Sequence, residues 1–129
     1  FMTRRTKKQS EARLHNKHSV GIGGHINSID AEGESIVIAG MKRELSEEVY
    51  IKSPYTYSFF GIINDNSSEV NSVHAGACFI IEVENRDVSV RETEKMEGIW
   101  VKKSELPLYE QTLEGWSRIL IKSYLEKEI

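Results

Sequence analysis

The chain has 129 residues, of which 39% are hydrophobic and 29% are charged, which is the size and composition of one globular domain. Its formal net charge of −3 gives no reason to expect a stable nucleic-acid partner. No apolar run approaches the ~18 residues of a membrane-spanning helix, and Cys78, the one cysteine, excludes an internal disulfide. We therefore expect a single cytoplasmic domain over residues 1–129, without a membrane partner.

The N-terminal segment is polar and basic over residues 3–12, which predicts a loop or the end of a strand. Phe1-Met2-Thr3 has the pattern of a strand end whose beginning is missing. The basic run at residues 4–8 is too short to indicate nucleic acid, but it could help to attract a phosphate-bearing ligand.

A glycine segment follows, Val20-Gly21-Ile22-Gly23-Gly24-His25-Ile26, in which apolar and small residues alternate. This alternation predicts a strand that is broken by glycine. The three glycines let the backbone approach a ligand or another strand closely. No Gly-Lys-Ser/Thr follows, so the segment is not a P-loop.

A helix is predicted from near Ser35 to about Lys52, because apolar residues recur at helical spacing and Pro54 disfavours continuation. On its opposite face, Glu44 precedes Glu47 by three residues and Glu48 by four, so the three carboxylates share one side. A hard divalent cation such as Mg²⁺, held by oxygen ligands, would relieve their repulsion. A solvated acidic face is the alternative for this pattern alone.

The rest of the chain predicts a hairpin from strands at residues 55–63 and 73–83, followed by short strands at 88–90 and 99–101. Cys78 lies within an apolar run of the hairpin and is expected to be a small core residue. An amphipathic helix is predicted over about residues 112–127. This order of elements indicates a mixed α/β domain with packed layers.

The sequence Arg43-Glu44-Leu45-Ser46-Glu47-Glu48 resembles the core of the Nudix hydrolase signature. That signature is Gly, five residues, Glu, seven residues, Arg-Glu-aliphatic-any-Glu-Glu-any-Gly-aliphatic. Gly23-Gly24-His25 is similar to its glycine opening, and Ile51 to its closing aliphatic residue. The resemblance covers most of the chain, from about Val20 to the C-terminal helix.

The sequence departs from this signature at three points. Nine residues separate Gly24 from Glu34, eight separate Glu34 from Arg43, and Tyr50 stands in place of the late glycine. The strands that usually precede the glycine segment are missing or reduced, which would leave an exposed sheet edge that a homodimer could cover. The resemblance implies an α/β fold (an α+β sandwich), with a mixed sheet flanked by the Nudix helix and a C-terminal helix.

The resemblance also implies hydrolysis of a nucleoside diphosphate that is linked to another moiety, with Mg²⁺ or Mn²⁺ as cofactor. It assigns metal binding to Glu47 and Glu48, a ligand or base role to Glu44, and orientation of these carboxylates to Arg43. Further implied ligands are the Gly24 carbonyl and one loop acid among Glu92, Glu94 and Glu97, of which Glu94 is preferred. His25 and Arg13 are candidate substrate-binding residues.

The alternative function is a Nudix-like domain that senses or binds a nucleotide without turning it over. The intact glutamate triad favours the enzyme, because a pure binding module does not need it. Nothing in the sequence identifies which diphosphate is the substrate.

Overall fold

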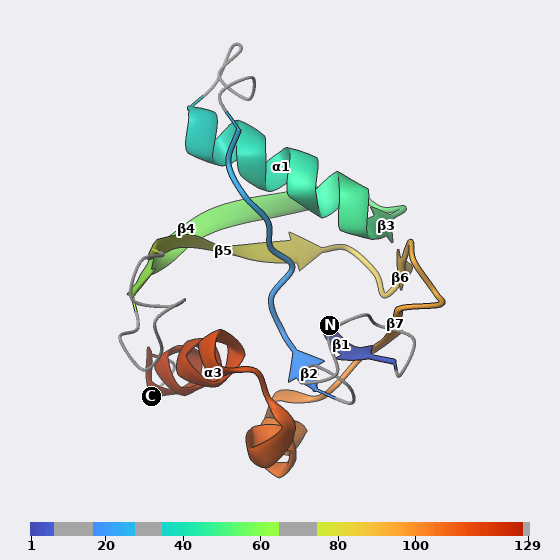
Figure 1. Cartoon of the computed structure of the whole chain (residues 1–129), viewed down its shortest axis with the longest axis vertical. Helices are drawn as coiled ribbons and strands as arrows, with labels where there is room; N and C mark the ends of the chain where they lie inside the picture. The colour runs from blue at the N-terminus through green and yellow to red at the C-terminus, as the bar shows by residue number, and fades with distance from the viewer. Residues whose placement is uncertain (7–16, 28–34, 65–74, 128–129) are drawn as a thin grey trace.

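The computed structural model describes residues 1–6, 17–27, 35–64 and 75–127 of the chain. Helix α1 (Ile36–Glu48) lies on one side of a hairpin formed by β4 (Tyr55–Asn64) and β5 (Ala75–Val83) (Figure 1). Helix α3 (Gly115–Lys127) lies on the other side. The predicted hairpin and mixed, layered α/β architecture are therefore confirmed.

The two sides of the hairpin contact different helices through different residues. Phe79 lines a cavity with α1, whereas a Cβ added at Gly76 would lie 2.7 Å from the ring of Trp116 on α3. Cys78, on the same strand, is half-buried, and burial raises the pKa of its thiol. The hairpin is thus the middle layer of the domain.

The N-terminal residues form a strand in the interior of a small sheet, where a loop or strand end was predicted. Strand β1 (Met2–Arg5) pairs antiparallel with both β2 (His18–Ser19) and β7 (Met96–Ile99). Two short strands, β1 and β2, therefore precede the glycine segment in the described part of the chain. Both edges of β1 are paired, and the homodimer stays a prediction.

Helix α1 ends at Glu48, earlier than the predicted end near Lys52. The next residues, Val49–Ile51, form β3, which pairs antiparallel with β6 (Val88–Val90). β-Branched and aromatic residues fit a pleated strand better than a helix end. Glu48 is therefore the last helical residue, directly before a strand.

The glycine segment, residues 20–27, is not the predicted strand, because the strand at this point contains only His18 and Ser19. Side-chain hydroxyls satisfy its first backbone groups: the N–H of Val20 donates to Ser117 Oγ over 3.1 Å and the N–H of Gly21 to Ser19 Oγ over 3.2 Å. Backbone groups bonded in this way need no neighbouring strand. The segment crosses the domain between β2 and the start of α1 (Figure 1).

The C-terminal part also differs in detail from the prediction. Strand β7 begins at Met96 and ends at Ile99, so Trp100 is outside it, and the Trp100 indole Nε1–H donates to the Arg86 carbonyl over 3.0 Å. A 3₁₀ helix, η3 (Lys103–Thr112), precedes α3, which therefore starts at Gly115 rather than near residue 112. None of the described helices combines the length and the apolar character needed to span a membrane.

Candidate functional site

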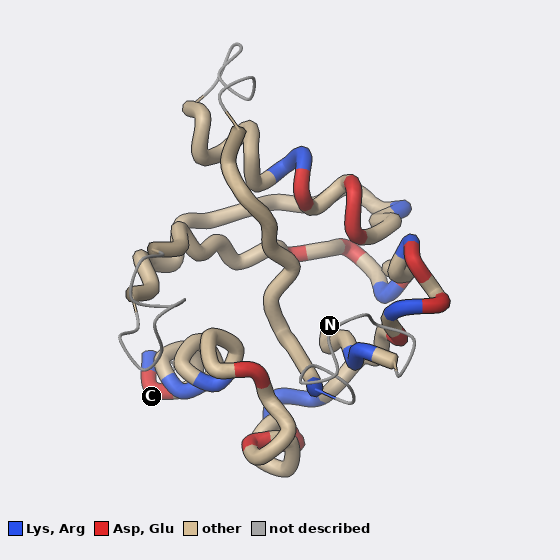
Figure 2. The backbone as a smooth tube through the Cα atoms, in the orientation of Figure 1, with Lys and Arg blue, Asp and Glu red and all other residues tan. Residues whose placement is uncertain are grey.

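The charged half of α1 is organised by Arg43, whose guanidinium donates to three acceptors. Nη1 lies 3.0 Å from Glu44 Oε1 and 3.2 Å from Glu47 Oε2, and Nη2 lies 2.7 Å from the carbonyl oxygen of His25. These acidic and basic positions lie next to each other along the second half of the helix (Figure 2). Arg43 therefore forms hydrogen bonds with two carboxylates of α1 and with the backbone of the glycine segment.

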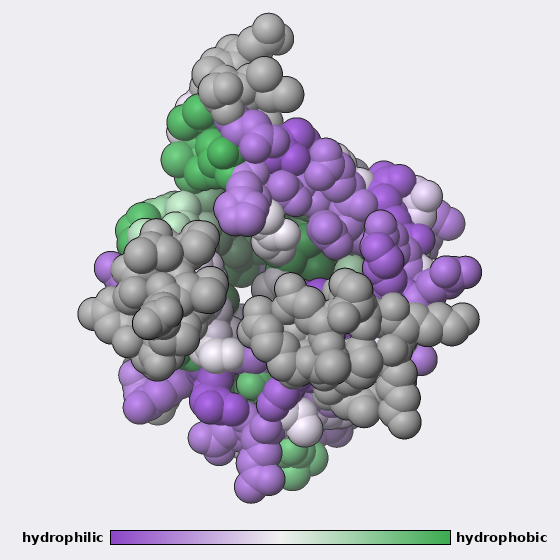
Figure 3. Space-filling model, in the orientation of Figure 1, coloured by the Kyte–Doolittle hydropathy of each residue, from purple (hydrophilic) through white to green (hydrophobic). Residues whose placement is uncertain are grey.

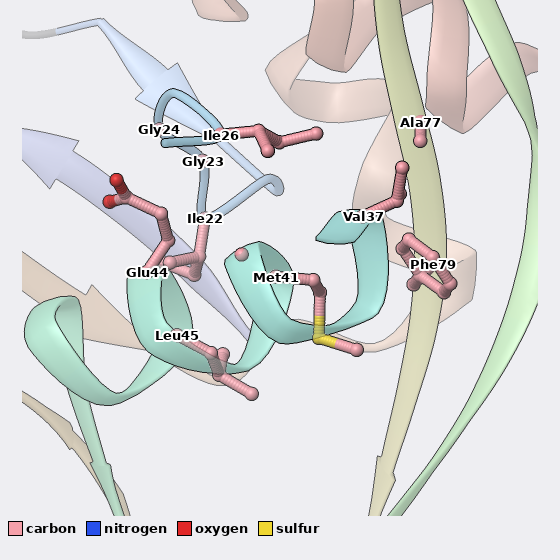
Figure 4. A pocket seen from close by; sticks show the side chains of 11 residues that line it. Ile22, Gly23, Gly24, Ile26, Val37, Met41, Glu44, Leu45, Ala77 and Phe79 are labelled. Carbon is pink, nitrogen blue, oxygen red and sulfur yellow. The ribbon is translucent and has the colours of Figure 1, made fainter. Parts of the chain in front are cut away.

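Gly24 lies directly against the carboxylate of Glu44. A Cβ added at Gly24 would overlap that carboxylate, whereas a Cβ at Gly23 would meet nothing within 4 Å. Glycine at position 24 is thus what allows the backbone to come this close. Beside this contact is a cavity of about 100 Å³, lined by the Glu44 side chain, by glycine backbone and by apolar side chains (Figure 4) that include Ile22, Ile26, Val37, Met41, Leu45 and Phe79.

Glu48 lines a second cavity, of about 170 Å³, on another side of the glycine segment. Its other charged lining residues are Arg5, Glu92 and Lys95. Burial raises the pKa of Glu48, the nearby carboxylates of Glu92 and Glu44 raise it further, and the positive charge of Arg5 opposes them. Ile22 and Gly23 line both cavities, so the glycine segment forms a wall of each.

The three loop glutamates have different surroundings. Glu92 lines the second cavity with Glu48. Glu94, the preferred loop ligand in the sequence analysis, is exposed, and its backbone carbonyl accepts a hydrogen bond of 2.6 Å from Thr6 Oγ1. Glu97 pairs with Arg4 across β1 and β7. The structure therefore places Glu92 beside Glu48, while a ligand role for Glu94 stays a prediction.

The predicted metal ligands are not assembled as one cluster. Among residues 1–6, 17–27, 35–64 and 75–127, no three His, Cys, Asp or Glu side chains are close enough together to hold a metal ion. Arg43 binds Glu44 and Glu47, while Glu48 lines the second cavity. Glu47 and Glu48 are adjacent and point about 100° apart around the helix axis, so Glu48 does not share the Arg43 contact of Glu47.

The two predicted substrate-binding residues have different outcomes. His25 is exposed next to the glycines, and its carbonyl accepts the bond from Arg43. Arg13 lies outside the described residues, as does Glu34. Arg5, which lines the second cavity, belongs to the basic run at residues 4–8 and was not singled out from it by sequence. Side chains alternate along a strand, so a strand at this point places Arg4 and Arg5 on opposite faces.

Three comparisons with known proteins bear on this chain. No protein-family model matches it. Protein YmaB of Bacillus subtilis (strain 168) is 35% identical to it over 129 residues, which cover 94% of this chain and 62% of YmaB. The crystal structure of Tm1382, described as a candidate Nudix hydrolase, matches with a TM-score of 0.79 and 33% identity, over 97% of this chain and 62% of Tm1382.

The chain thus spans less than two thirds of both proteins that it matches. The likeness to Tm1382 extends over nearly the whole chain and includes the glycine segment, α1, the hairpin and α3. The fold is therefore a Nudix-like α+β fold.

Proposed function

We propose that this chain is a Nudix-type hydrolase that uses Mg²⁺ or Mn²⁺ to cleave a diphosphate linkage in a nucleoside diphosphate joined to another moiety. The observation that carries the proposal is the contact of Arg43 with Glu44, Glu47 and the His25 carbonyl. It sets Arg43 and Glu44 of the Arg-Glu-x-x-Glu-Glu motif against the glycine segment, while Glu47 is 56% exposed. The Nudix-like fold supports the same assignment.

The donor atoms of the site fit a hard divalent cation, because they are carboxylate oxygens, which Mg²⁺ and Mn²⁺ prefer. Glu48 also lies close to like charges, and a cation would relieve that repulsion. We assign metal binding to Glu47 and Glu48, with Glu44, a loop glutamate and the Gly24 carbonyl as further candidates. When bound, the cation would offset the negative charge of the diphosphate and make water a stronger nucleophile.

The protein's own contribution to the reaction is to orient the base. Arg43 binds Glu44 Oε1, and Gly24 lies against the same carboxylate, so its position is constrained from two sides. Held in this way, Glu44 Oε2 is available to accept a proton from the attacking water. The geometry therefore suits Glu44 as the base and Arg43 as the residue that orients it.

The experiment is phosphate release, measured colorimetrically with a coupled phosphatase, from a panel of nucleoside diphosphate derivatives. We expect turnover with Mg²⁺ or Mn²⁺, loss of turnover in EDTA, and a rate at least about 100-fold lower for Glu48→Gln. Glu126→Gln removes the same charge from an exposed position on α3 and should match the wild type.

Equal rates for the wild type and Glu48→Gln across the panel would refute the hydrolase. The alternative, a nucleotide-binding domain without turnover, predicts a different result. In that case calorimetry would detect binding of a panel compound, while no phosphate would be released by any variant.

A further inference from the structure

We propose that Arg5 binds a phosphate group of the substrate in the second cavity and that Glu114 positions Arg5 for this role; the inference rests on the proposed hydrolase function. Side chains alternate along a strand, so Thr3 and Arg5 of β1 share a face, and both line the cavity that contains Glu48. Arg4 points to the other face and pairs with Glu97. Strand geometry thus selects one of the two adjacent arginines.

Glu114 fixes the orientation of Arg5. The Arg5 Nε–H donates to Glu114 Oε1 over 2.8 Å, and the two side chains are only 28% and 24% exposed. Glu114 is itself held, because its N–H donates to the His18 carbonyl over 2.9 Å. Among the described residues, the side-chain partner of Arg5 is Glu114, and Glu114 accepts a hydrogen bond only from the Arg5 Nε–H. The terminal amino groups of the guanidinium are left for a ligand.

The cavity suits a phosphate next to a cation site. Its volume of about 170 Å³ exceeds that of several water molecules, at ~30 Å³ each. An anion that enters beside Glu48 and Glu92 needs positive charge nearby, and Arg5 of the same cavity provides it. Lys95 is the weaker candidate, because it is 53% exposed and lies 3.5 Å from Glu92. A guanidinium also matches the oxygens of a phosphate with paired donors, which an ammonium cannot do.

The test is isothermal titration of the whole chain with magnesium imidodiphosphate, a diphosphate analogue in which an NH group replaces the bridging oxygen. We expect Arg5→Gln to weaken binding by about tenfold or more, because a charge-assisted hydrogen bond is lost. Arg5→Lys should retain part of the affinity. Arg4→Gln removes the same charge one residue away, and its affinity should stay within about twofold of the wild type.

Glu114→Gln separates binding from a merely structural role. This variant breaks the ion pair between Arg5 and Glu114 but keeps the Arg5 guanidinium, so the affinity for imidodiphosphate should fall only about threefold. If Arg5 served the fold alone, the two variants would lose stability and affinity equally, and the inference would be overturned. Unchanged imidodiphosphate binding in Arg5→Gln, or no binding by the wild type, would overturn it as well.

Kinetics distinguishes this inference from the proposed function. For any substrate that is turned over, Arg5→Gln should raise KM with little change in kcat, whereas Glu48→Gln should lower kcat. Turnover with an unchanged KM in Arg5→Gln would refute the phosphate-binding role and leave the hydrolase intact. Arg5-dependent binding of imidodiphosphate without turnover of any substrate would support the phosphate site and refute the hydrolase.

Discussion

The glycine segment separates two charged regions that are built differently. On the first side, Arg43 contacts both Glu44 and Glu47, and Glu44 is the one charged residue that lines the first cavity among the described residues. On the second side, Glu48 and Glu92 line a charged cavity, and no described residue forms an ion pair with Glu48. The charged residues of α1 lie in its second half, where the surface is hydrophilic, while hydrophobic surface gathers near the start of the helix (Figure 3).

The difference shows that neighbours in a motif need not share an environment. Glu47 and Glu48 are adjacent, yet Glu47 is paired with Arg43, while burial and then neighbouring carboxylates raise the pKa of Glu48. The first side is held together by the protein itself. The second side has negative charge that a bound cation would compensate, so we expect the two sides to respond differently to mutation and to metal.

The largest difference in kcat is expected between alanine variants of the two adjacent glycines, Gly23 and Gly24. Gly24→Ala forces the Glu44 carboxylate to move, whereas the Cβ of Gly23→Ala has open space. Because a carboxylate ends a flexible side chain, we expect Gly24→Ala to change the free energy of unfolding by about 1 kcal/mol or less. Its kcat should fall by about 100-fold, since a displacement of roughly 1 Å can cost that much. Thermal melting and kcat of both variants test this, and equal kcat values would show that Glu44 needs no fixed position.

A smaller effect is expected from Arg43, which holds the first side together. Arg43→Gln removes the guanidinium contacts with Glu44, Glu47 and the His25 carbonyl, and we expect kcat to fall by about 30-fold. Arg43→Lys keeps the charge but cannot bridge the same acceptors, so it should restore only part of the rate. Full activity in Arg43→Lys would mean that charge alone matters on this side, and that the bridging geometry does not.

The parts of the fold that local pattern determines were predicted from the sequence. The helix that carries the motif, the hairpin and the last helix all have periodic apolar residues, and each was found close to its predicted range. The errors lie where pairing partners are distant in sequence. Val49–Ile51 became a strand because β6 pairs with it, and Met2–Arg5 became an interior strand because β2 and β7 lie on either side.

The candidate site, like the fold, was predictable where it depends on local spacing and not where it depends on residues distant in sequence. The helix spacing identified the three glutamates and Arg43, but it could not show that Arg43 also reaches the His25 carbonyl. The choice among the loop glutamates depends on which of them lines the second cavity, and only the structure shows that Glu92 does so. Contacts of this kind arise from tertiary packing, which local sequence does not encode.

The smallest predicted effect concerns Glu48 and the stability of the second side without metal. The pKa of Glu48 is raised above its ordinary value of 4.5, chiefly by burial and then by Glu92 and Glu44. The stability that protonated Glu48 contributes is therefore present below pH 4.5 and is lost as pH rises through the folded-state pKa. In EDTA at neutral pH, Glu48→Gln should be more stable than the wild type, by about a few tenths of a kcal/mol after solvent screening.

Chemical denaturation across a pH series measures this difference, which should shrink as pH falls toward the ordinary glutamate pKa. Addition of Mg²⁺ should stabilise the wild type and leave Glu48→Gln nearly unchanged, because only the wild type offers the Glu48 carboxylate to the cation. Glu126→Gln should show neither effect, since it lies at an exposed position on α3. If Glu48→Gln were less stable than the wild type in EDTA, the protein itself would already compensate the negative charge of Glu48. The contrast between the two sides would then fail.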